Sequence, residues 1–335
     1  MAGACLLFTV RPALAIEEEN GSAFLDGSGY LRPRASPDGK AIAYLQYDLE
    51  GKHLSLRIRS LSAGSTGERV LAQQINDASD LAWRPSGGAL AVLRMVEGRT
   101  RLYVVSDNGN VLRSIPLPPE SIEGGLAWLA DSDRVVVGTR TALLIMNITS
   151  GDLISRIDLA KAGLSPDLGA ISVSARDRLA FTASRSGAVS GGSRVWIIDE
   201  WNADPSPKPI TAGPTDSSPQ WIGDSAIVFS RDDASATWKR GSAQFSLRHL
   251  WKVSLADGAE TELTHGQVRD DYPTWISGKG IVVFSRVPFY SLKADQEKTS
   301  SELVPSKPLS TILTSISREV LFLARESRVA WIPMS

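Results

Sequence analysis

A turn-and-strand motif that recurs along the chain constrains the fold more than any other feature. Its clearest copy is Ser36-Pro37-Asp38-Gly39-Lys40-Ala41-Ile42-Ala43-Tyr44, in which a tight polar turn precedes a short apolar strand. An anchor residue ends the strand before each turn. The anchors are Ala35, Trp83, Trp128, Val173, Trp221 and Trp275, at spacings of 48, 45, 45, 48 and 54 residues. A fixed period of this size, filled with short strands, is typical of a β-propeller.

Each repeat supplies four strands, and the third and fourth are joined by a hairpin. Asn108-Gly109, Ser150-Gly151 and Asp257-Gly258 are strong hairpin signals, because these residues tolerate positive φ. The tryptophans among the anchors recur at one structural position. We therefore expect them to pack between adjacent blades, where each would bury a large area.

The C-terminal tail contains what looks like one more repeat. Residues 311–316, 320–324 and 327–332 match the first three strands of a blade, and no fourth follows. An open blade would leave unpaired backbone groups at an edge, so residues 21–25 are expected to supply the missing strand. The sequence thus predicts an all-β propeller of seven four-stranded blades closed by the N-terminal strand, with six blades as the alternative.

Composition limits the classes of partner. The 36 basic and 37 acidic residues leave a formal net charge of −1, so no overall field attracts nucleic acid or an anionic membrane. No apolar run reaches the length of a membrane-spanning helix. Together with the repeats, this favours one globular domain, expected to be a monomer without a membrane span.

Residues 1–15 resemble a secretory signal peptide, with an apolar core followed by Ala13-Leu14-Ala15 as a cleavage site. The alternative is an apolar N-terminus without a targeting role. Export would place residues 16–335, the propeller domain, in the periplasm or outside the cell. The single cysteine, Cys5, lies in the leader, so the mature chain has neither a disulfide framework nor a cysteine-based zinc site.

Four stretches resemble the repeats of TolB-like (WD40-like) propellers. They are the motif at residues 36–44, the strings Asp216-Ser217-Ser218-Pro219-Gln220-Trp221 and Asp270-Asp271-Tyr272-Pro273-Thr274-Trp275, and residues 250–266. The resemblance covers residues 20–335 and implies a propeller without the N-terminal domain of that family. It also implies a non-enzymatic interaction module of the bacterial cell envelope, with an envelope protein or a peptidoglycan-associated lipoprotein as partner.

Catalytic motifs are weak. The sequence has no Gly-x-Ser-x-Gly nucleophile elbow, and His53, His249 and His265 form no metal-binding spacing. Asp232-Asp233 and Asp270-Asp271 could act as acid and base, but carboxylates also end strands and cap turns. No catalytic residue, metal site or cofactor is therefore predicted. The alternative function is a polysaccharide lyase or hydrolase on a seven-bladed scaffold.

The candidate partner site lies on the face of the propeller that carries the connection between the second and third strands of each blade. Residues 231–246 form the longest connection there and carry Trp238 and Arg240. Aromatic and arginine side chains on a projecting loop are common binding hot spots. A hairpin with Trp238 folded back onto its blade is the alternative. We expect a site formed by Trp238, Arg240, Asp216, Arg269 and Asp270.

Overall fold

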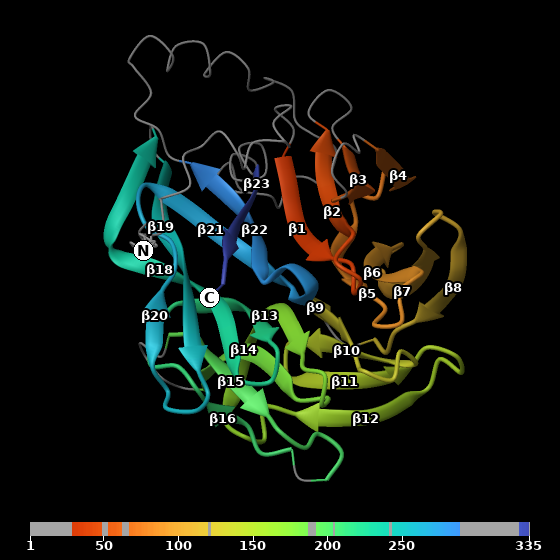
Figure 1. Ribbon diagram of the computed structural model, residues 1–335. Helices are drawn as coiled ribbons and strands as arrows, with labels where there is room; N and C mark the ends of the chain where they lie inside the picture. The colour runs from red at the N-terminus through yellow and green to blue at the C-terminus, as the bar shows by residue number, and fades with distance from the viewer. Residues whose placement is uncertain are drawn as a thin grey trace, which may run out of the picture.

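The computed structural model describes residues 29–48, 53–61, 67–119, 122–186, 192–203, 205–240, 243–288 and 328–334. These residues form antiparallel sheets arranged around a centre, with one short 3-10 turn at Ser277–Lys279 (Figure 1). The structure is an all-β propeller, as the repeats predict. None of the described residues forms a helix long and apolar enough to cross a membrane.

The first four sheets each contain four strands in sequence order. The first two sheets comprise β1 (Gly29–Ala35), β2 (Ala41–Asp48), β3 (His53–Ser60) and β4 (Glu68–Ala72), then β5 (Ala78–Trp83), β6 (Ala89–Val96), β7 (Arg99–Ser106) and β8 (Val111–Pro116). The next two comprise β9 (Ile122–Trp128), β10 (Arg134–Thr139), β11 (Ala142–Asn147) and β12 (Leu153–Asp158), then β13 (Leu164–Val173), β14 (Leu179–Arg185), β15 (Arg194–Ile198) and β16 (Lys208–Pro209).

The fifth sheet has seven strands in two halves. The first half is β17 (Asp216–Ile222), β18 (Ala226–Arg240), β19 (Ala243–Ser254) and β20 (Glu260–Glu262), and the second is β21 (Val268–Ile276), β22 (Ile281–Pro288) and β23 (Arg328–Pro333). A single parallel pairing between Arg248 and Arg269 joins the two halves into one sheet.

The prediction of seven blades is wrong, and six separate blades are not observed either. The described strands make five blades, the fifth being seven strands wide. Residues 328–333, assigned from sequence to a seventh repeat, pair antiparallel with β22 instead. β21 also contacts β1 directly, so the described ring closes without another blade between them. The predicted closing strand at 21–25 and the predicted strands at 311–316 and 320–324 lie outside the described residues.

The hydrophobic core consists of separate clusters between successive units of the ring. One of them joins Trp128 and Leu126 of the third blade to Ala82 and Leu102 of the second. Because both faces of each sheet are covered, inner strands such as Val135–Val137 are fully buried, whereas the outer strand β8 is largely exposed. The apolar runs in the repeats are therefore explained by burial on two sides.

The anchor tryptophans pack against the preceding unit, which confirms their predicted role. The indole N–H groups of Trp83 and Trp128 donate to carbonyl oxygens one unit back, those of Arg34 and Ala82. Trp221 packs in the cluster that contains Ala180 of the fourth blade. The same contact, an anchor tryptophan packed on the preceding unit, therefore recurs along the ring.

The prolines that precede three anchors mark β-bulges in the innermost strands. Arg32, Ser218 and Tyr272 have φ values of 51°, 50° and 52°, and each is followed by proline. In each strand the pairing register shifts at this point. Bulges redirect a side chain that regular pairing would hold in place, and here they act on residues at the centre of the ring.

Candidate functional site

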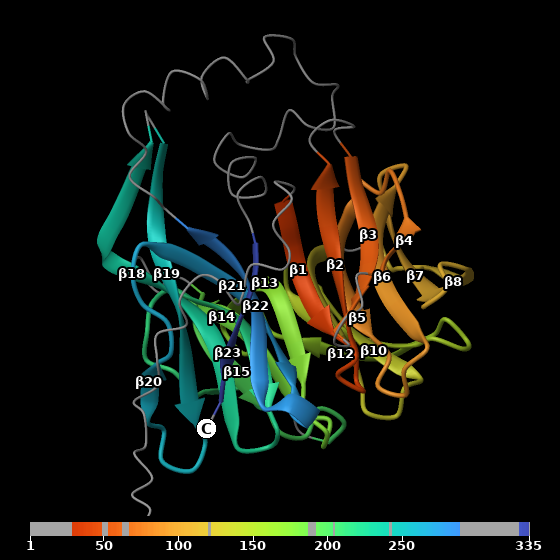
Figure 2. The same cartoon turned by 45° about the horizontal axis from the view of Figure 1, so that its top comes forward.

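The connection at residues 231–246, expected to be a loop, is mostly regular hairpin. β18 and β19 continue as paired strands, with Trp238 opposite Phe245 and Arg240 opposite Ala243. The register shifts between Asp232 and Thr237. The two strands contain 15 and 12 residues and are the longest of the described strands, and Figure 2 shows them rising above the neighbouring strands β14, β15 and β21.

Asp216 lies at the base of this hairpin and is fully buried. Its carboxylate accepts a hydrogen bond from Thr211 and a bidentate pair from Arg231, at 2.6 Å from Nε and 3.2 Å from Nη2. Burial raises the pKa of Asp216, and the hydrogen bonds from Arg231 and Thr211 only partly oppose that effect. Arg231 also binds Glu260 at 2.6 Å. Asp216 therefore positions Arg231 and has no surface of its own to offer.

Asp270 forms the equivalent ion pair in the second half of the fifth sheet. It is fully buried and accepts from Nε and Nη2 of Arg286, both at 2.8 Å. In both units the arginine lies directly across the antiparallel ladder from the aspartate. Each guanidinium also lies over a phenylalanine ring two residues earlier, at 5.0 Å for Phe229 and 5.2 Å for Phe284.

Sequence reasoning found these aspartates and missed their arginine partners. The signal was present as the repeated tripeptides Phe229-Ser230-Arg231 and Phe284-Ser285-Arg286. A charged residue at the same place in two buried strands points to a buried counter-charge, because an unpaired buried charge is very costly.

Arg269 belongs to a charged network that ties the hairpin to β21. Its Nη1 lies 3.4 Å from Asp232 and donates to the Ser246 carbonyl at 3.3 Å. Arg248 also pairs with Asp232, and it reaches Asp271 at 2.6 Å. Burial would raise the pKa of Asp271, but the charges of Arg248 and Arg269 outweigh it and hold this pKa at about 2.

Of the five predicted site residues, the structure brings Asp216, Arg269 and Asp270 to neighbouring strands of the fifth blade. Trp238 and Arg240 belong to β18, in the hairpin that this strand forms with β19. Asp216 and Asp270 are each fully buried in an ion pair, so neither offers an exposed surface.

Arg32 makes polar contacts across the centre of the ring that the sequence did not predict. Arg32, on the innermost strand of the first blade, donates to the Gly169 carbonyl of the fourth at 2.7 Å. It also lies 3.4 Å from Asp80 of the second blade and 4.7 Å from the ring centroid of Tyr272. One side chain therefore connects four units at the axis of the propeller.

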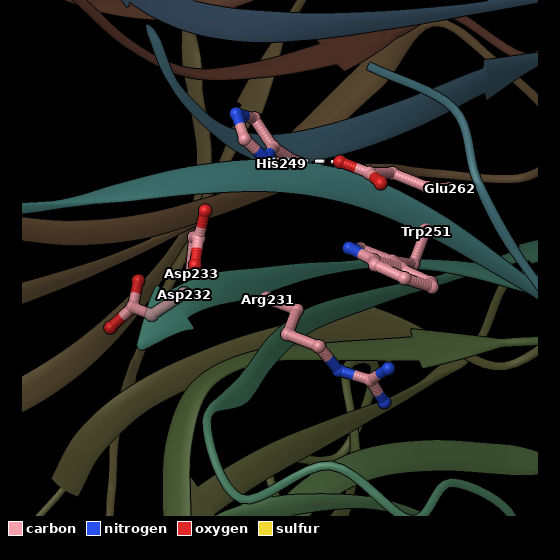
Figure 3. A pocket seen from close by; sticks show the side chains of 6 residues that line it. All are labelled: Arg231, Asp232, Asp233, His249, Trp251 and Glu262. Atoms are coloured by element: carbon pink, nitrogen blue, oxygen red, sulfur yellow. Dashed lines mark ion pairs between the residues drawn. The ribbon is translucent and has the colours of Figure 1, made fainter. Parts of the chain in front are cut away.

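A pocket of about 310 Å³ opens at the base of the hairpin (Figure 3). Its lining consists of Arg231, Asp232, Asp233, His249, Trp251 and Glu262. Arg231 pairs with His249 across the ladder, and Trp251 pairs with Glu262. Arg231, His249 and Trp251 lie on the same face of the fifth blade as Phe229 and Val253, which pack on the fourth blade.

Two of the three histidines, His249 and His265, lie in this region on either side of one carboxylate. His249 Nδ1 and His265 Nδ1 lie 3.1 and 3.2 Å from the same Glu262 oxygen, and His249 Nε2 faces the Gly266 carbonyl at 2.9 Å. Glu262 is on the outermost strand of its unit, away from the centre of the ring. Within the described ranges, no group of three or more histidine, cysteine, aspartate or glutamate side chains could hold a metal ion.

The sheet arrangement and the interlocking tryptophans define a β-propeller, and comparison with solved structures makes the class more specific. A protein assigned as TolB from Agrobacterium tumefaciens is similar over 71% of this chain and 81% of its own, with 19% identity and a TM-score of 0.53. TolB from Acinetobacter baumannii is similar over 76% of this chain and 62% of its own, with 14% identity and a TM-score of 0.52. This chain thus spans less than two thirds of the Acinetobacter protein.

A nidogen/laminin complex contains another propeller of similar shape, at 10% identity and a TM-score of 0.50 over 71% of this chain and 80% of that one. No family model matches the sequence, and no curated protein matches it either. At these identities the likeness is one of fold. The chain has the fold of TolB-like β-propellers, as the motif at residues 36–44 suggested.

Proposed function

We propose that this chain is a non-enzymatic protein-interaction module of the bacterial cell envelope, and that the β18–β19 hairpin makes the main contact with its partner. The observation that carries the proposal is the length of β18 and β19, which are the longest of the described strands and rise above their neighbours β14, β15 and β21. A paired strand extension presents side chains on a rigid support, which lowers the ordering cost of binding. The TolB-like fold supports the envelope setting and a partner such as an envelope protein or a peptidoglycan-associated lipoprotein.

The proposed roles follow from the place of each residue in the strands and, for the two aspartates, from burial. Trp238 and Arg240 are the direct contacts, because they lie near the hairpin tip. Arg269 belongs to the charged network at the hairpin base. Asp216 and Asp270 act indirectly, by holding Arg231 and Arg286 in place.

The test is capture of envelope proteins by the purified chain and by the double variant Trp238→Ala/Arg240→Ala. Recovery of a specific partner should fall by more than tenfold, since aromatic and arginine hot spots each contribute about 2 kcal/mol or more. The matched control is Val111→Ser/Leu112→Ser, which changes two exposed side chains on the edge strand β8. Equal recovery with all three proteins, each correctly folded, would refute the hairpin's role.

Export is tested separately. Expression of the full chain in a bacterial host, followed by fractionation and mass measurement, should yield a periplasmic or secreted protein that lacks residues 1–15. An unprocessed protein that stays with the cytoplasmic fraction would contradict the envelope assignment.

A further inference from the structure

Exposed apolar side chains gather on one side of the propeller. Among the described residues, every exposed large apolar side chain belongs to the first three blades. Five of the six lie on the outermost strands β4, β8 and β12, and these are Val70, Val111, Leu112, Leu153 and Ile154. The outermost strands of the fourth and fifth blades, β16 and β20, carry only polar side chains and one proline. The fold therefore does not require apolar side chains at this place.

The three outermost strands form one continuous outer wall. Figure 1 shows β4, β8 and β12 on the side of the ring away from the β18–β19 hairpin. The turn before β8 packs on β4, since Arg69 Nη1 lies 3.3 Å from Asn108 Oδ1 and a Cβ atom at Gly109 would lie 3.0 Å from the Leu71 carbonyl oxygen. The turn before β12 lies against β8 in the same way. We call the five exposed apolar side chains, together with Arg69 and Arg113, the outer-wall patch.

The arginines around the patch outnumber their acidic neighbours. Strands β3, β4, β7 and β8 carry six arginines and one carboxylate, that of Glu68. Glu97 and Asp107, on the turns before and after β7, bring the carboxylates to three, so this part of the wall has a net charge of +3. Arg99 and Arg113 are exposed and form no ion pair with a described residue. The whole chain carries −1, so the positive charge is local.

Two kinds of partner fit this wall poorly. Each of the three outermost strands has a register shift at the patch, opposite Leu56–Arg57, Val104–Val105 and Ile145–Met146. Bulges of this kind bend an edge strand and disfavour the addition of a further strand. A second copy bound symmetrically through the patch would place arginines against arginines, which is unfavourable. The occupant must therefore be anionic, accept aliphatic side chains and need no strand pairing.

The surface of an anionic bilayer meets these requirements. Its phosphates accept charge-assisted hydrogen bonds from arginine, and its headgroup region accepts aliphatic side chains that flank a basic surface. A protein partner fits less well, because none of the exposed large apolar side chains is aromatic, and leucine and valine are under-represented at protein hot spots. We propose that the outer-wall patch binds the surface of an anionic phospholipid bilayer. This second surface is separate from the hairpin and does not depend on the proposed function.

Co-sedimentation with vesicles tests the proposal. The purified full chain is mixed with vesicles of phosphatidylglycerol and phosphatidylcholine in equal parts, or with vesicles of phosphatidylcholine alone. Binding to the anionic vesicles is expected, and it should weaken at high salt because the arginine charges are then screened. Binding to the neutral vesicles should be weaker by about tenfold or more, since each arginine near an anionic surface adds to the affinity.

Two variants separate the charge of the patch from its apolar contact. Arg69→Gln/Arg113→Gln should weaken binding to the anionic vesicles by about tenfold. Val111→Ser/Leu112→Ser should weaken it by a similar factor, because several buried methyl and methylene groups are lost. Circular dichroism checks that each variant is folded. All variants keep residues 1–15, so any contribution of that apolar segment is the same in each.

The matched control is Arg176→Gln/Lys208→Gln, which removes two charges from the fourth blade at side chains that are 77% and 66% exposed. It should leave binding unchanged. Three results would overturn the proposal: no binding of the unchanged protein to anionic vesicles, equal binding to both kinds of vesicle, or equal affinity of the control and the outer-wall variants. An acidic protein captured through Arg69 and Arg113, without vesicle binding, would assign the patch to a protein partner instead.

The two surfaces can be distinguished by exchanging the assays. The hairpin variant Trp238→Ala/Arg240→Ala should bind vesicles as the unchanged protein does, and Val111→Ser/Leu112→Ser should capture the protein partner normally. Vesicle binding that fails while hairpin-dependent capture succeeds would refute the bilayer proposal and leave the proposed function standing. Patch-dependent vesicle binding with unchanged capture by the hairpin variant would refute the hairpin's role alone.

Discussion

Replacing Asp80 by asparagine should destabilise the whole ring, because this buried carboxylate joins three blades. Oδ1 accepts from Arg34 at 3.1 Å and from the Leu81 N–H at 2.8 Å, and it lies 3.4 Å from Arg32. Oδ2 accepts from the Leu126 N–H at 3.0 Å. Asp80 itself has no exposed surface.

All these neighbours are donors, so an amide cannot replace the carboxylate. In Asp80→Asn either the arginines or the Leu126 N–H must face an NH₂ group, and both guanidinium groups lose their counter-charge. Breaking a buried ion pair from one side costs about 3–5 kcal/mol. A buried backbone donor without an acceptor costs about 1–3 kcal/mol, a penalty that overlaps with the first. We expect a total loss of about 3–5 kcal/mol in the free energy of unfolding.

Urea unfolding followed by tryptophan fluorescence and by far-UV circular dichroism measures this loss, provided that the two transitions coincide. Asp199→Asn is the control, because its ion pair with Lys208 is at the surface, with side-chain exposures of 39% and 66%. That change should cost less than about 1 kcal/mol. If Asp80→Asn also cost less than about 1 kcal/mol at an unchanged m-value, the reasoning about the centre of the ring would be wrong.

Three further changes test the packing and the charges. Trp128→Phe should cost about 1 kcal/mol more than Trp221→Phe, since Trp128 donates a hydrogen bond and the Trp221 indole N–H has no partner among the described residues. Asp271→Asn should cost most at neutral pH, and the cost should shrink as pH falls from about 4 toward 2, because the folded-state pKa is held at about 2 and the unfolded value is about 3.9. Gly39→Ala should cost about 2 kcal/mol, since φ is 68° and the new Cβ would lie 2.8 Å from a buried side chain. Gly87→Ala, at φ 79° with open space around it, should cost about half as much. Urea unfolding measures all of these, and equal costs for the two glycine variants or a pH-independent cost for Asp271→Asn would contradict the stated causes.

The architecture could be predicted because its determinants are local and repeated. A turn, an apolar strand and an anchor such as Trp128 recur at a near-constant period, and each repeat adds one unit. The number of blades depends instead on which strands pair across long separations. Residues 328–333 are as apolar as a new strand would be, and only their pairing with β22 assigns them to the fifth blade. Such partner choice is a tertiary property that local pattern does not encode.

The site was predictable in part for the same reason. Asp216 and Asp270 stand out in the sequence because they recur before Trp221 and Trp275, but recurrence does not distinguish a buried ion pair from a surface contact. Their arginine partners lie 15 and 16 residues downstream, at positions that only the antiparallel register brings opposite. Arg32 was harder still, because its partners at Asp80, Gly169 and Tyr272 come from three other units.

In the β18–β19 hairpin the sequence pattern no longer indicates strands. Strands within the ring alternate or run apolar because a neighbouring blade covers them. Beyond the fourth blade the strands β18 and β19 have no such neighbour among the described residues, so residues 232–240 need not be apolar and resemble a loop in sequence. Backbone pairing continues the strands there, and Arg269 holds both of them at the base through Asp232 and the Ser246 carbonyl. The extension therefore depends on pairing that the sequence pattern does not signal, and shortening residues 232–246 to a tight turn should remove it while leaving the buried pairing of residues 226–231 in place.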